Sequence, residues 1–183
     1  VTAIAHDSGA AEFVAAWLLE SRTPFVASTA GPAKEVFENS FGNFENLTIQ
    51  EAVKRGEWVL AGSGWQTDFE KRGVSFALSS NRPVIYCMDH WTNFRERLWF
   101  DGNLISPDII WLTDDLARSR FGDEVPESFC TEVVGNRHLD KMIRAIKTEQ
   151  RVHARTPNGG KSVLMLTENT SQHAQRQYGD PLY

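Results

Sequence analysis

The sequence predicts an α/β protein built on an open, Rossmann-like parallel sheet with helices on both faces. Short apolar runs alternate with amphipathic segments along most of the 183 residues, and this alternation is typical of βαβ units. The apolar run Pro83–Met88 lacks the polar alternation of a half-exposed strand, as expected when both faces of a strand are covered. Small or charged residues follow each run, where a strand would pass into a helix.

The elements follow from these patterns in chain order. The helix predicted over 10–21 carries Phe13, Val14, Trp17 and Leu18 at helical spacing. Thr48 is a candidate cap for the segment over 47–55, and either Thr67 or Asp68 can cap the helix that runs through Ser80. Glu70 lies three residues after Thr67, the spacing of a capping box. Residues 93–100 are helical or irregular. Strands are expected at 1–5, 24–28, 58–61, 83–88, 108–112 and 129–134, and further helices at 31–39, from 116 and at 138–150.

Composition and charge exclude several classes of protein. Hydrophobic residues make up 41% and charged residues 23%, in the range of soluble globular domains. No apolar run approaches the roughly 18 residues of a transmembrane helix. The net charge of −5, from 24 acidic and 19 basic residues, has the wrong sign for a general nucleic-acid binder.

The two cysteines and the start of the chain bear on location. Cys87 and Cys130 lie in apolar, strand-like runs, so we expect two buried free thiols, which suit a reducing compartment. No signal peptide is visible. We therefore expect a cytoplasmic location, and peripheral association of a parent protein with a membrane stays open.

A change of composition marks a domain boundary. Residues 1–150 form the predicted Rossmann-like domain, and residues 151–161 are a linker that contains the turn signal Pro157-Asn158-Gly159-Gly160. Residues 162–183 begin with another apolar run, Ser162–Leu166. They are expected to be the start of a second, mostly absent domain or an extra strand on the first sheet.

Four polar clusters directly follow apolar strands. In an open parallel sheet the carboxyl ends of the strands share one edge, where ligands bind, and the helix starts there supply free N–H groups. Each cluster could instead be only a helix cap or a tight turn. The clusters are His6-Asp7-Ser8-Gly9, Gly62-Ser63-Gly64-Trp65, Asp89-His90-Trp91 and Thr113-Asp114-Asp115.

Acid–base chemistry is the first use expected of this edge. Asp89 and His90 are the first candidate catalytic residues, followed by Asp7 and Glu70. Arg95 and Arg97, near Asn93, could hold a carboxylate or phosphate, or could form a solvated face with Glu96. Substrate binding is expected from His6, Ser8, Gly9, Ser63, Gly64, Trp65, Trp91, Asn93, Arg95 and Arg97, with Trp65 and Trp91 suited to stacking on sugar rings.

A metal site is the main alternative to acid–base chemistry at this edge. His6, Asp7, Asp89, His90, His138 and Asp140 include suitable ligand types. The sequence lacks a His-Glu-x-x-His motif, a cysteine pair and an Asp-rich loop, and adjacent strand residues point to opposite faces. We expect no metal, and a metal-dependent α/β hydrolase remains an alternative.

Three stretches carry a resemblance to a known family. Asp89–Arg97, Gly62–Glu70 and Val133–Asn136 together resemble the amino-terminal domain of bacterial GT-B-type glycosyltransferases of surface-polysaccharide assembly, which are akin in fold to the UDP-N-acetylglucosamine 2-epimerase group. The resemblance covers residues 1–150. It implies that this domain holds a glycan acceptor, that a second domain binds a nucleotide-sugar as co-substrate, and that no further cofactor is used. It also implies that His6, Asp7, Ser63, Trp65, Asp89 and His90 face the interdomain cleft.

If residues 162–183 are only the start of a second domain, another class of function stays open. Residues 1–150 could form a sugar- or nucleotide-binding module without chemistry of its own. The transferase predicts acid–base residues at the strand edge, whereas the module needs only the binding groups.

Overall fold

The chain forms a parallel, six-stranded sheet and a separate small hairpin. The computed structural model describes residues 1–64, 67–125 and 128–152, with side chains as far as Thr148. The elements are β1 (Thr2–Ala5), α1 (Ser8–Ser21), β2 (Val26–Thr29), α2 (Pro32–Phe41), α3 (Ile49–Arg55), β3 (Val59–Gly62), α4 (Phe69–Ser79), β4 (Val84–Met88), α5 (Phe94–Leu98), β5 (Trp99–Phe100), β6 (Asn103–Leu104), β7 (Ile109–Leu112), α6 (Asp115–Glu124), β8 (Thr131–Val133) and α7 (Arg137–Val152).

The strand order of the main sheet is β2-β1-β3-β4-β7-β8, and every pair in it is parallel. This confirms the predicted fold class. The order reverses at β1, because β2 lies on one side of β1 and β3 lies on the other. Such a reversal opens a crevice at the carboxyl ends of the two central strands. The chain therefore has a topological switch point between β1 and β3.

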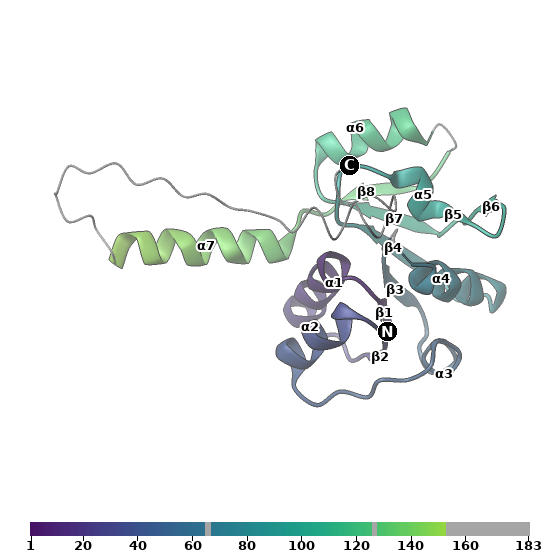
Figure 1. Ribbon diagram of the computed structural model, residues 1–183, viewed down its shortest axis with the longest axis horizontal. Coiled ribbons are helices and arrows are strands. Elements are labelled where there is room, and N and C mark those ends of the chain that lie inside the picture. The colour runs from purple at the N-terminus through teal and green to yellow at the C-terminus, as the bar shows by residue number, and fades with distance from the viewer. Residues whose placement is uncertain (65–66, 126–127, 153–183) are drawn as a thin grey trace, which may run out of the picture. The chain divides into compact units, whose positions relative to one another are not determined.

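Helices cover both faces of the sheet. Figure 1 shows α1 and α2 on one side of β1 and β3, and α3 and α4 on the other. Each face of the sheet has its own hydrophobic core, and successive residues of a strand point into different cores. Ile4 belongs to the core under α3 to α6, whereas its neighbours Ala3 and Ala5 belong to the core under α1 and α2. Both faces of the sheet are buried under helices, which explains why the central strands are apolar throughout.

Three tryptophan side chains lie together against the sheet. Trp17 of α1 has its ring centroid 5.8 Å from that of Trp58 and 5.4 Å from that of Trp111. Trp111 is buried, and Trp17 and Trp58 are partly buried. Aromatic pairs at these separations stabilise beyond the area they bury. The first helix is thereby fixed against the sheet.

Some local predictions were wrong. Helix α4 begins at Phe69 after Asp68, which makes no side-chain cap, so Thr67 and Glu70 do not form a capping box. The true capping box joins Thr48 and Glu51 at the start of α3. Cys87 is buried but Cys130 is exposed, because Cys130 directly precedes β8, which lies at the edge of the sheet.

Two further details differ from the expectations. Helix α1 begins at Ser8 rather than at residue 10. Residues 93–100 divide into the short helix α5 and strand β5, which pairs with β6 in an antiparallel hairpin. A strand of two residues is too short to show the alternation of apolar and polar residues by which strands are predicted, so this hairpin was not expected.

Residues Val1–Thr148 form one compact unit, and Glu149–Tyr183 are assigned to another. The predicted linker from residue 153 onward and the whole of 162–183 lie outside the described residues. None of the described helices combines the length and apolar composition that crossing a bilayer requires.

Candidate functional site

The loops at the switch point bring two predicted clusters together. His6 and Asp7 follow β1, and Ser63 and Gly64 follow its neighbour β3. Asp7 is the N-cap of α1, and its Oδ1 accepts a hydrogen bond from Ala10 N at 2.9 Å. Because the two strands run in parallel, both loops lie at the same edge of the sheet.

Glu70 joins this edge from α4. Its side chain is fully buried, and its Oε1 accepts hydrogen bonds from His6 N at 2.6 Å and Asp7 N at 3.4 Å. Its other oxygen, Oε2, has no hydrogen-bond partner among the described residues. Glu70 therefore supports the loop after β1 through Oε1, while Oε2 is buried without a hydrogen bond from the described residues.

Burial changes the acidity of Glu70. Removal from water and the negative charge of Asp7 raise the pKa of this carboxyl, hydrogen bonds from the backbone oppose the shift, and the net result is a pKa of about 7. A carboxyl with a pKa near 7 exchanges its proton in the neutral range, as acid–base groups of active sites do.

Gly64 allows Asp7 and Glu70 to come close. A Cβ atom at Gly64 would lie 2.9 Å from both Asp7 Oδ2 and Glu70 Oε2. Real Cβ atoms keep a larger distance, so any side chain here would push the carboxyl groups aside. The absence of a side chain at residue 64 is therefore required for this pair.

A second group forms around Arg97, which is only 4% exposed. Its Nη1 donates to Asp89 Oδ1 at 2.9 Å, to Ser63 Oγ at 3.1 Å and to the Ser63 carbonyl oxygen. Its Nε donates to the Thr92 carbonyl oxygen at 3.3 Å. The guanidinium thus ties the loop after β3 to the loop after β4. We expected Arg97 to bind substrate, and the structure places its head group among the protein's own acceptors.

Effects of opposite sign act on the pKa of the Asp89 carboxyl. Burial raises the pKa of the Asp89 carboxyl, the positive charge of Arg97 lowers it, and the negative charge of Asp7 raises it again, with a net upward shift. The carboxylate remains partly accessible, since 14% of the side chain is exposed. Asp89 is therefore the acidic partner of a mostly buried pair that still reaches the surface.

A pocket of about 470 Å³ opens beside Asp89. A Cβ at Gly9 would lie 2.5 Å from Asp89 Oδ2, so the carboxylate lies against the first turn of α1. The Trp91 indole is fixed, because its Nε1 donates to both oxygens of Asp114, at 3.0 and 2.8 Å. The pocket, called here the strand-edge pocket, is lined by Ser8, Gly9, Glu12, Asp89, Trp91, Asn136, His138 and Leu139.

The other predicted residues are placed less centrally. His6 lies against Gly31, whose φ is +54° and where a Cβ would be 2.7 Å from the imidazole ring. His90 is exposed, with Nδ1 3.2 Å from Thr92 Oγ1. The guanidinium of Arg95 lies 5.7 Å from the centre of the Trp99 ring. Asn93 precedes α5 with a φ of +60°, and Trp65 lies outside the described residues.

Four residues of the pocket were not among those expected to bind substrate, although His138 had been considered as a metal ligand and Asn136 lies in a stretch that carries the resemblance. Glu12 lies one turn after Gly9 on α1, so helical spacing could have indicated it. Asn136, His138 and Leu139 come from the start of α7, after the edge strand β8. His138 reaches α1 through an ion pair of 3.0 Å between its Nδ1 and Glu12 Oε2.

In the part of the chain that the structure describes, no group of three or more His, Cys, Asp and Glu side chains is arranged to hold a metal ion. Comparison of the chain with protein-family models, curated proteins and solved structures gives no match. What the site can do is therefore inferred from its own side chains.

Proposed function

We propose that this chain is the amino-terminal, acceptor-binding half of a glycosyltransferase that moves a sugar from a nucleotide-sugar to a glycan acceptor. The observation that carries the proposal is the position of Asp89. Its carboxylate lines a pocket at the carboxyl ends of parallel strands, beside a fixed tryptophan. The same position also follows from the resemblance of residues 89–97 to transferases of this type.

The reaction requires a group that accepts a proton. As the acceptor hydroxyl attacks the anomeric carbon, a C–O bond forms, the bond from that carbon to the donor phosphate breaks, and the hydroxyl proton leaves. We assign this proton to Asp89. The raised pKa of the Asp89 carboxyl makes it a better base than an exposed aspartate, while Arg97 keeps it oriented.

Binding of the acceptor uses the other walls of the pocket. The Trp91 indole, fixed through Asp114, offers an aromatic ring to the C–H groups of a sugar. Asn136 and Ser8 supply polar groups at the same pocket. The fixed orientation of the tryptophan lowers the entropic cost of binding.

Glu70 and Asp7 have a supporting part in this scheme. Glu70 is too deeply buried to touch a substrate, so it is a positioning residue that holds the loop after β1. A proton on its free Oε2 would lower the negative charge near Asp7, and hence near Asp89. We therefore expect the rate to depend on pH around neutrality.

Turnover of the Asp89→Asn variant tests the proposal, in a protein that joins this chain to its donor domain. Loss of a general base should lower turnover at least about a hundredfold, with little change in acceptor binding. Asp123→Asn is the matched control, because Asp123 is exposed near the end of α6. Normal turnover of the Asp89→Asn variant would remove Asp89 from this role.

Titration of the present chain separates transfer from binding alone. We expect it to bind oligosaccharide acceptors, with weaker binding after Trp91→Ala, and not to bind UDP-glucose or UDP-N-acetylglucosamine. Donor binding by this chain would contradict the division of labour between domains. It would favour a nucleotide-sugar binding module instead.

A further inference from the structure

Helix α7 has an exposed apolar stripe. Leu139, Met142, Ile143 and Ile146 are spaced three and four residues apart, which places them on one side of the helix. Their side chains are 41%, 47%, 47% and 50% exposed. Four large apolar residues aligned on a surface helix form the kind of patch that marks an interaction site.

The remaining surface of α7 is basic. The segment 137–152 has five basic and two acidic residues, a net charge of +3, whereas residues 1–136 have 11 basic and 20 acidic residues, a net charge of −9. At 100° per residue, Arg137, Lys141 and Arg144 lie on the side opposite the stripe. The net positive segment therefore coincides with the exposed apolar stripe.

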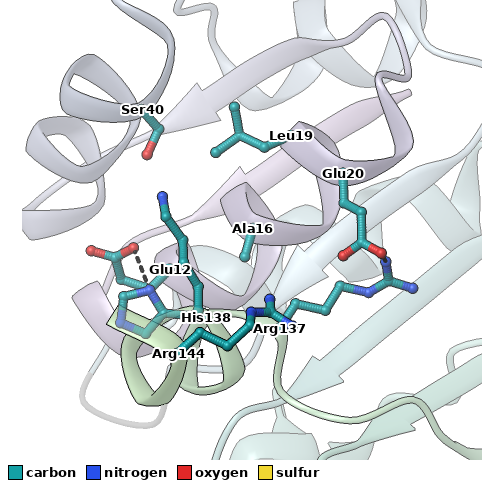
Figure 2. A pocket seen from close by; sticks show the side chains of 9 residues that line it. Glu12, Ala16, Leu19, Glu20, Ser40, Arg137, His138 and Arg144 are labelled. Carbon is teal, nitrogen blue, oxygen red and sulfur yellow. Dashed lines mark ion pairs between the residues drawn. The ribbon is translucent and has the colours of Figure 1, made fainter. Parts of the chain in front are cut away.

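The start of α7 is fixed to the rest of its unit. Arg137 Nη1 forms an ion pair of 2.6 Å with Glu20 Oε1, and His138 pairs with Glu12 at 3.0 Å. Figure 2 shows the two ion pairs at different points along α1, with Ala16 between Glu12 and Glu20. The polar side of α7 begins against α1. Met142, Ile143 and Ile146 lie on the other side of the helix, and Leu139 borders the strand-edge pocket.

We propose that α7 binds the surface of an anionic lipid bilayer, with the stripe inserted between the head groups. A helix with an apolar stripe and a basic polar side is suited to lie in the interface of such a membrane. The helix is about 10 Å across, close to one Debye length at 0.1 M salt, so its basic residues still attract anionic lipids from the far side. The acidic remainder of the unit would be repelled, which favours an orientation with α7 towards the membrane.

Charge argues against two other occupants of the stripe. A second copy would bring another helix of net charge +3 against the first. Residues 153–183 of the same chain have three basic and two acidic residues, so they offer no complementary charge. An anionic bilayer would bury the apolar stripe and would attract the basic residues of the same helix.

Vesicle flotation of the whole chain tests this inference. Phosphatidylcholine vesicles that contain about one-third phosphatidylglycerol should bind the protein, and pure phosphatidylcholine vesicles should not. Lys147→Gln, which changes a lysine at the border of the stripe, should weaken binding about fivefold. Lys141→Gln should weaken it less, because Lys141 lies on the side of the helix away from the bilayer. The double variant Ile143→Asp/Ile146→Asp should lower binding at least about tenfold.

A matched control is Leu116→Asp, which places a charge at an exposed leucine of α6 and should leave vesicle binding unchanged. Equal binding to neutral and anionic vesicles, or unchanged binding of the Ile143/Ile146 variant, would overturn the proposal. A lower melting temperature of that variant would also overturn it, because it would show that the chain itself covers the stripe. A change from dimer to monomer, without vesicle binding by the wild type, would assign the stripe to a second copy.

Discussion

Replacing Glu70 by Gln removes a titratable proton and keeps the shape of the side chain. The amide oxygen can still accept the hydrogen bonds from His6 N and Asp7 N that Oε1 accepts in the wild type. The amide nitrogen takes the place of the unpartnered Oε2 and can donate towards Asp7. The substitution therefore isolates the electrostatic cost of the buried carboxyl.

The magnitude follows from the raised pKa. Folding shifts the pKa of Glu70 from its ordinary value of 4.5 to about 7, and each unit corresponds to about 1.4 kcal/mol, so ionisation costs the folded state about 3 kcal/mol. The sign is set by the proton: the folded state binds it more tightly than the unfolded state. The wild type consequently loses this stability as the pH rises from about 4.5 to about 7, and the Gln variant does not.

Urea unfolding at about pH 5 and about pH 8.5 measures the effect. The free energy of unfolding of Glu70→Gln, relative to the wild type, should increase by about 2 to 3 kcal/mol between the two pH values. Glu57→Gln changes an exposed glutamate and serves as the control, with a difference that stays constant. A difference between Glu70→Gln and wild type that does not change with pH would refute the reasoning.

Three further predictions concern the buried groups. Arg97→Met leaves the Asp89 carboxylate without its buried cation and should lower the free energy of unfolding by about 3 to 5 kcal/mol in urea titrations; an effect below about 1 kcal/mol would show that water replaces the guanidinium. Phe37→Ala removes a fully buried ring under α2 and should cost about 3 to 5 kcal/mol by the same measurement. A thiol reagent should modify Cys130 but not Cys87 in the native protein, because Cys87 is buried and burial raises the pKa of its thiol, and both should react in urea; two reactive thiols before unfolding would contradict the burial of β4.

The sheet could be predicted because both of its faces are covered. Each central strand must then be apolar along its length, so runs such as Pro83–Met88 stand out against the polar residues that follow them. The edge of the sheet carries a weaker signal. Around Cys130 the chain reads as an apolar run, but β8 has a neighbour on one side only, and a residue at its start is left exposed.

The polar clusters after the strands could be predicted, but their partners could not. Glu70 occupies the third position after Thr67, which is the local spacing of a capping box. Its carboxyl instead accepts N–H groups that lie 64 and 63 residues away in sequence. Local periodicity carries no information on such a contact. The same holds for His138, which reaches the pocket from the start of α7 and meets Glu12 across it.

The identity of residue 70 bears on what the site does. If the side chain served only to hold the loop after β1, glutamine would accept the same two N–H groups without the cost of about 3 kcal/mol that ionisation brings at neutral pH. The carboxyl is destabilising there, and it lies beside Asp7 at the switch point of the sheet. Buried groups that reduce stability in this way are concentrated where chemistry or binding uses them. The electrostatic cost at Glu70 is thus an argument for function that is independent of the resemblance at residues 89–97.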